Sequence, residues 1–183
     1  MSAEGVGIDP LPILYLEDSA QDVELVEATL AAEGLACTVH WVETAVRFRQ
    51  ALAEPELRLI LSDYALPGFD GLGALREARE QRPELPFIFV SGAIGEERAI
   101  ESLKQGATDY VLKQRLTRLG PAVRRALQEA AERTKWKRVE EALRESEARF
   151  RRSFELGLVG MVIASPTKEL HEVNDQLCKL LEY

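Results

Sequence analysis

Five polar residues, each at the end of a short apolar run, have side chains that could together handle a phosphoryl group and a metal ion. The five are Glu17, Asp18, Asp63, Ser91 and Lys113. Three carboxylates in one pocket repel one another unless a proton or a cation is bound. Hard oxygen ligands favour Mg²⁺, which readily shares its coordination with a phosphate oxygen. A hydroxyl and an ammonium group would donate to phosphoryl oxygens, so the set suits transfer of a phosphoryl group to a carboxylate.

Bringing these residues together requires a sheet whose strands all end at one edge. Short apolar runs predict five strands at residues 13–16, 37–41, 57–61, 86–91 and 109–113. Patterns of helical period lie between them, at about 22–33, 44–54, 71–81 and 96–105. Strands that alternate with helices predict an α/β fold with a parallel sheet covered on both faces. Such sheets bind their ligands at the carboxyl ends of the strands.

Each of these residues also has a simpler interpretation. Asp63 follows an unbroken apolar run typical of a strand buried on both faces, but Asp is also common in turns. Glu17 and Asp18 could cap the next helix, and Ser91 and Lys113 taken singly would be surface residues at strand ends. Tyr110, on the fifth predicted strand, is by itself an ordinary packed strand aromatic. The functional interpretation depends on all of these residues occurring together at this spacing.

Four stretches of the chain carry a family resemblance. They are Tyr-Leu-Glu17-Asp18-Ser, Leu-Ser-Asp63-Tyr-Ala-Leu-Pro67-Gly-Phe-Asp-Gly71, Phe-Val-Ser91-Gly-Ala and Gly106-Ala-Thr-Asp-Tyr110-Val-Leu-Lys113. Together they resemble the response-regulator receiver domain of two-component signalling, over about residues 11–127. The resemblance implies a flavodoxin-like, doubly wound five-stranded parallel sheet of order 2-1-3-4-5.

The resemblance also implies roles for the site residues. Asp63 would accept a phosphoryl group from a histidine kinase or phosphotransfer protein. Mg²⁺ would be held by Glu17, Asp18, Asp63 and the backbone carbonyl of Ala65. Lys113 and Ser91 would contact the phosphoryl group, and Ser91 and Tyr110 would form the switch. The family usually has Pro after the lysine, often with a cis peptide bond, whereas this chain has Gln114. A cis bond there would cost about 2.5–4 kcal/mol, so we expect trans.

The chain beyond the receiver is predicted to continue as one long helix. No Gly or Pro occurs between Pro121 and Gly157. An apolar seam in steps of 3 and 4 recurs at Trp136, Val139, Leu143 and Phe150, with Ser146 between the last two. We therefore expect a homodimer formed through this helix. The heptad register of the seam slips near residues 133–136, where we expect a hinge.

The last part of the chain resembles the start of a PAS sensory domain. The resemblance rests on Ser146–Ala164 and on Glu172–Tyr183, which include the Val173-Asn174 step into a helix. We expect a tail at 1–10, the receiver at 11–127, a coiled-coil linker at 128–150 and a partial PAS domain at 151–183 without a ligand site. The chain would then be a piece of a longer receiver–PAS protein. Such arrangements often precede histidine kinase or diguanylate cyclase domains, but neither His40 nor His171 has the context of a phosphoaccepting histidine.

The composition of the chain limits its location and the classes of function that it could have. The chain of 183 residues is 46% hydrophobic and 30% charged, with net charge −8 and no long apolar run or signal peptide, so we expect a cytoplasmic protein without membrane contact. Its two cysteines fit no metal or redox spacing.

Bases interleaved with Glu along 113–152 indicate a solvated helix. Because the sequence also has no helix-turn-helix stretch, we expect no nucleic acid to bind here. The alternative enzyme is a Mg²⁺-dependent aspartate-nucleophile phosphatase, which would need an acid where Ala65 stands.

Overall fold

The computed structural model describes residues 10–92, 96–157, 159–166 and 170–181, so the expected tail lies outside it apart from Pro10. The chain divides into two compact units between Glu132 and Arg133, and each is described by itself. The first unit contains β1 (Leu11–Leu16), α1 (Ala20–Ala32), β2 (Cys37–Val42), α2 (Ala45–Leu52), β3 (Leu59–Ser62), α3 (Gly71–Gln81), β4 (Phe87–Ser91), α4 (Glu96–Lys104), β5 (Asp109–Leu112) and a 3₁₀ helix at Lys113–Arg118. Helix α5 (Leu119–Glu155) begins in this unit and extends into the second.

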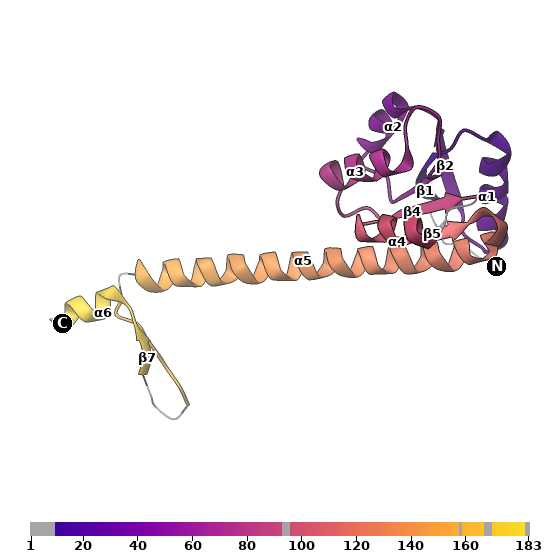
Figure 1. The fold of residues 1–183 in the computed structure, drawn as a ribbon. Coiled ribbons are helices and arrows are strands. Elements are labelled where there is room, and N and C mark those ends of the chain that lie inside the picture. The colour runs from indigo at the N-terminus through magenta and orange to yellow at the C-terminus, as the bar shows by residue number, and fades with distance from the viewer. Residues whose placement is uncertain (1–9, 93–95, 158, 167–169, 182–183) are drawn as a thin grey trace, which may run out of the picture. The chain divides into compact units, whose positions relative to one another are not determined.

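The first unit is built on a five-stranded parallel sheet (Figure 1). Its strand order is β2-β1-β3-β4-β5, as predicted. The central strands β1, β3 and β4 are buried along most of their length, as their unbroken apolar runs indicated. Strands β1 and β3 are neighbours although α1, β2 and α2 separate them in the chain, so their carboxyl ends meet at the point where the strand order reverses.

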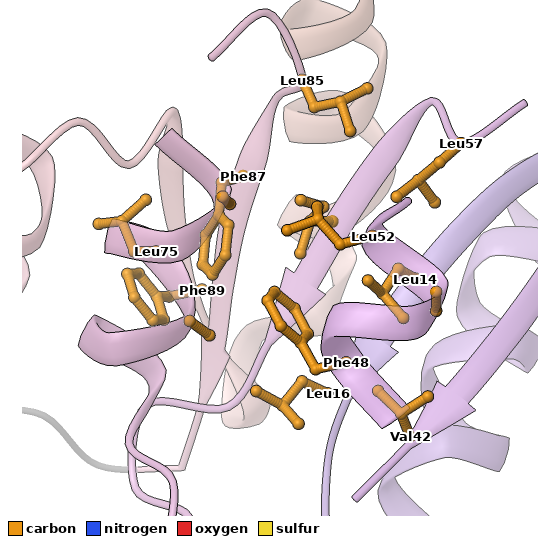
Figure 2. Close-up of a cluster of buried hydrophobic side chains, with 14 of the residues drawn as sticks. Leu14, Leu16, Val42, Phe48, Leu52, Leu57, Leu75, Leu85, Phe87 and Phe89 are labelled. Atoms are coloured by element: carbon orange, nitrogen blue, oxygen red, sulfur yellow. The ribbon is translucent and has the colours of Figure 1, made fainter. Parts of the chain in front are cut away.

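Successive residues of each central strand face opposite sides of the sheet. On one side, Leu14, Ile60 and Phe87 pack with Phe48 and Leu52 of α2 and with residues of α3 (Figure 2). On the other side, the alternate residues of the same strands pack against α1 and the start of α5. The sheet therefore has a separate hydrophobic core on each face, because side chains alternate along a strand.

Strand β3 is shorter than the apolar run that predicted it. The run begins at Leu57, but the strand begins at Leu59. Leu57 is buried, yet its amide donates to the carbonyl of Glu54 in a turn, so it cannot join the ladder with β1. Leu57 fills the core beneath the end of the strand instead. Burial and strand pairing are separate requirements, and an apolar run indicates only the first.

Helix α5 has 37 residues, as the absence of Gly and Pro predicted. Its first turns are part of the core, where Ala122, Val123 and Ala126 are buried. The predicted seam residues further along are exposed in the single chain, and Trp136 is 72% exposed. Among the residues that the structure describes, no helix is both long and apolar enough to cross a membrane.

The second unit consists of the end of α5, the strands β6 (Val162–Ala164) and β7 (Leu170–Val173), and α6 (Asp175–Leu180). Strands β6 and β7 pair antiparallel. Asn174 is fully buried at the centre of the unit. Its side-chain nitrogen donates to the carbonyls of Phe154 and Val159. Its side-chain oxygen accepts from Met161 N and caps α6.

Candidate phosphoryl-transfer site

The carboxyl ends of β1 and β3 bring the predicted acids together. The amide of Asp63 donates to the carbonyl of Leu16 at 2.9 Å, which continues the β1–β3 ladder by one step. Carboxylate oxygens of Glu17, Asp18 and Asp63 all lie within 4.8 Å of one another. Glu17 is fully buried, Asp63 is nearly so, and Asp18 is exposed. Three acids at such distances form a donor set that suits a hard divalent cation.

Glu17 is held by four donors. Its Oε2 accepts from the Tyr15 hydroxyl at 2.8 Å and lies 2.8 Å from Lys113 Nζ. Its Oε1 accepts from the backbone amides of Asp18 and Ser19, each at 3.2 Å. Burial raises the pKa of the Glu17 carboxyl despite the bonds from Lys113 and Tyr15. Burial and the neighbouring Glu17 charge likewise raise the pKa of Tyr15, so the phenol remains a donor.

The two oxygens of Asp63 face different partners. Oδ1 accepts from the amides of Tyr64 at 2.5 Å and Ala65 at 3.3 Å. Oδ2 accepts from Lys113 Nζ at 2.8 Å. The carboxylate is therefore oriented by the backbone of its own loop on one side and by a cation on the other.

Lys113 contacts three carboxylates at once. Its Nζ lies 2.8 Å from Glu17, 2.8 Å from Asp63 and 2.6 Å from Asp22. Burial lowers the pKa of Lys113, but its hydrogen bonds to these carboxylates outweigh burial and raise the pKa overall. The ammonium thus stays charged, and it offsets only part of the negative charge around it.

The remaining predicted residues lie on the neighbouring strands and loops. Ser91 is the last residue of β4, is buried, and is paired in register with Leu112, the residue before Lys113. Tyr110 lies on β5, partly buried against the same core as Phe89. Ala65 follows Asp63 by two residues and is exposed. The structure therefore places Ser91, Ala65 and Lys113 at the same carboxyl-terminal edge of the sheet as the acids, whereas Tyr110 lies two residues before the end of β5.

Gln114 occupies the position after the lysine. No peptide bond is cis in the part of the chain that the structure describes, which confirms the expected trans geometry at this residue. The side-chain amide of Gln114 donates to the backbone carbonyl of Gly92, which follows β4. Gln114 is the second residue of the 3₁₀ helix, within which Arg115 departs from helical dihedral angles.

The loop after Asp63 is held by Gly71. The amide of Gly71 donates to the carbonyl of Tyr64, and a Cβ at Gly71 would lie 2.7 Å from the Phe89 ring and 3.0 Å from Tyr64 Cα. Asp70 caps α3 through a 2.6 Å bond from Gly73 N. Only glycine fits where α3 begins this close to the backbone of the site.

Three residues of the site were not predicted from the sequence. Tyr15 and Asp22 contact Glu17 and Lys113 as described, and Trp41 Nε1 donates to the backbone carbonyl of Glu17 at 2.7 Å. Asp22 gave no specific signal, because an acid in the first turn of a helix is expected for the helix dipole alone. Tyr15 and Trp41 gave none, since each lies within a predicted strand, where aromatic residues are common.

Comparison with known proteins identifies relatives of the first unit. The family model described as "Response regulator receiver domain" matches residues 13–124. NtrC of Escherichia coli, described as a DNA-binding transcriptional regulator, is 33% identical over 102 residues, which are 55% of this chain and 21% of NtrC. FleR, a response regulator protein of Pseudomonas aeruginosa, is 32% identical over 101 residues, again 55% of this chain and 21% of the relative. The chain thus spans about a fifth of the length of these relatives.

Solved structures agree with the family match. The receiver domain of NtrX from Brucella abortus superimposes with a TM-score of 0.57 at 32% identity, covering 63% of this chain and 98% of that one. NtrX from the same organism in complex with ADP gives a TM-score of 0.63 at 28% identity, covering 70% of this chain and 29% of that one.

Proposed function

Because this chain belongs to the response regulator receiver family, we propose that its first unit is a phosphorylation switch in which Asp63 accepts a phosphoryl group from a histidine kinase or phosphotransfer protein. The observation that supports this most directly is the environment of Asp63. Its carboxylate follows a buried strand, lies 2.8 Å from Lys113 Nζ and stands beside two further acids. This is where a doubly wound sheet presents its ligands.

The acids also fit the metal that such a reaction requires. We propose that Glu17, Asp18, Asp63 and the backbone carbonyl of Ala65 hold Mg²⁺, since the donor set consists of hard oxygens with a net negative charge. When bound, the cation would neutralise charge that develops on the transferred phosphoryl group. Lys113 Nζ lies 2.8 Å from the carboxylates of Glu17 and Asp63. Tyr15 and the amides of the β1–α1 turn hold Glu17 in place.

The test is acyl phosphate formation. The whole chain is incubated with acetyl phosphate and Mg²⁺, and the modified residue is located by mass spectrometry. Asp63→Asn is expected to abolish the product, and Asp18→Ala is expected to remove its dependence on Mg²⁺. Asp70→Asn is the matched control, because Asp70 is an exposed acid in the same loop and Asn caps a helix as well as Asp does. Product at the wild-type level in Asp63→Asn would refute the assignment.

We further propose that the phosphorylated state is passed on through Ser91, Tyr110 and α5. A phosphoryl group on Asp63 offers a strong acceptor to the Ser91 hydroxyl, and Tyr110 lies on the strand next to β4. The start of α5 packs on the same sheet, so a shift of β4 and β5 reaches it. Ser91→Ala should retain phosphorylation yet reduce the change in hydrogen exchange over residues 119–132. An unchanged response in Ser91→Ala would argue against this route.

The exposed seam of α5 supports a homodimer. Trp136, Val139, Leu143 and Phe150 are each more than half exposed in the single chain and recur in steps of 3 and 4 or their sum. Light scattering on the whole chain should give twice the chain mass, and Leu143→Glu should give a monomer. Leu25→Glu is the control, since Leu25 is also half exposed but lies on α1. A monomeric wild type, or equal disruption by both variants, would contradict the seam.

We propose that the second unit is the start of a PAS domain and that the chain is part of a longer signalling protein, such as a sensor histidine kinase. The support is the order of elements after α5 and the buried Asn174 that joins them. NtrC is described as DNA-binding, but its match covers only 102 residues, so we carry no DNA-binding role over to this chain. Expressing the parent gene and assaying autophosphorylation with ATP would test the kinase context.

A further inference from the structure

Asp22 is an acid of the site that lies outside the motifs of the family resemblance. It stands in the first turn of α1, and its side chain is 32% exposed. Its Oδ2 lies 2.6 Å from Lys113 Nζ, the shortest of the three carboxylate contacts that Lys113 makes. The two residues are 91 positions apart, so the contact comes from the fold and not from chain proximity.

The three carboxylates account for all the donors of Lys113. A lysine ammonium has three N–H groups, and Glu17, Asp22 and Asp63 each lie within 2.8 Å of Nζ. A phosphoryl oxygen that reaches Lys113 must therefore take the place of one of them. The site as it stands has no spare donor on this residue.

Asp22 is the carboxylate that can leave most readily. Glu17 has no exposed surface and is fixed by Tyr15 and two backbone amides. Asp63 is itself the residue that would carry the phosphoryl group. Asp22 is one third exposed, so water can replace Lys113 as its partner at little cost.

We propose that Asp22 is a positioning residue that competes with the phosphoryl group for Lys113 and is displaced when that group arrives. The inference rests on the proposed function of Asp63. In the resting site Asp22 holds the ammonium and adds negative charge beside the metal ligands. It therefore strengthens Mg²⁺ binding and weakens binding of the phosphoryl group.

The proposal predicts two effects of opposite sign in one variant. Asp22→Asn keeps the size of the side chain but removes its charge. Measured by calorimetry on the whole chain, its affinity for Mg²⁺ should fall about two- to fivefold, the range expected for a partly exposed ion pair. Its affinity for beryllofluoride at saturating Mg²⁺ should rise by a similar factor, because Lys113 is then easier to recruit. General damage to the site would weaken both.

Two further variants complete the test. Glu24→Gln removes the same charge from an exposed position of α1 two residues away, and both affinities should stay at the wild-type values. Asp22→Glu restores the charge and should move both affinities back towards wild type.

The outcomes separate the inference from the function on which it rests. Equal loss of both affinities in Asp22→Asn, no change in either, or the same pattern in Glu24→Gln would overturn the role of Asp22 while leaving Asp63 as phosphoacceptor. A wild-type chain that binds no beryllofluoride and forms no acyl phosphate would overturn the proposed function and the inference together.

Discussion

Replacing Gly71 by Ala should destabilise the first unit and disturb the Asp63 loop at the same time. The added methyl group would lie 2.7 Å from the Phe89 ring and 3.0 Å from Tyr64 Cα, and it would also meet the carbonyl oxygen of Asp63. Two of these neighbours are backbone atoms, so rotation of a side chain cannot relieve the contact. Either α3 moves away from the sheet or the loop after β3 shifts.

The magnitude follows from two opposed effects. Overpacking of a filled site costs about 1–3 kcal/mol. Replacing Gly by Ala also restricts the unfolded chain, which offsets about 0.4–1 kcal/mol of that loss. The net expectation is a loss of about 1 kcal/mol in the free energy of unfolding. Gly92→Ala is the control, because beyond its chain neighbours no atom of the described residues lies within 4 Å of its added Cβ, and it should be neutral or slightly stabilising.

Native-state hydrogen exchange measures this loss in the first unit alone. Amides of β3 and β4 are in the buried centre of the sheet, so they exchange through global unfolding of that unit. The protection free energy of peptides from these strands should fall in Gly71→Ala and not in Gly92→Ala. Acyl phosphate formation should slow in Gly71→Ala because the Asp63 carbonyl is displaced. Wild-type protection in Gly71→Ala would refute the reasoning, as would an equal loss in Gly92→Ala.

Three other changes have definite expected outcomes. Phe48→Ala removes a fully buried ring from the core in Figure 2 and should lower the free energy of unfolding in urea by about 3–5 kcal/mol. A loss under 1 kcal/mol would argue against that packing. Asp70→Ala loses the α3 cap and should cost about 1 kcal/mol in the same assay, whereas Asp70→Asn should cost little. The pKa of Glu17 is raised in the folded protein, so ionisation of this carboxyl opposes folding. Without metal, the stability of Glu17→Gln relative to wild type should therefore increase as the pH rises from about 4.3 through the folded pKa. A stability difference that decreases over that range would contradict this expectation.

The sheet and the positions of its strand ends could be predicted from the sequence. Strands buried on both faces produce unbroken apolar runs, and helices of 3.6 period lie between them. Because parallel strands end at a common edge, Asp63 and Lys113 could be placed together although 50 residues separate them. The strand order itself came from the family resemblance. It determined that β1, rather than β2, lies beside β3.

The finer structure of the site could not be predicted, because it depends on the directions of side chains. Tyr15 lies in an apolar strand, where its hydroxyl gives no sign of its partner, yet it donates to Glu17. Asp22 lay at the predicted start of a helix, where an acid is expected for the helix dipole alone. Only the packing of α1 against the sheet brings it to Lys113.

The bond from Trp41 to the backbone of Glu17 also gives the protein an optical reporter of its own. The indole N–H is fixed 2.7 Å from the carbonyl that precedes Asp18, while the side chain stays 40% exposed to solvent. A change in net charge at the neighbouring carboxylates alters the electric field along the indole and therefore its emission. We therefore expect the emission of Trp41 to change when a cation or a phosphoryl group arrives, and to report it in real time without an attached dye once Trp136 has been replaced by Phe to remove the second emitter.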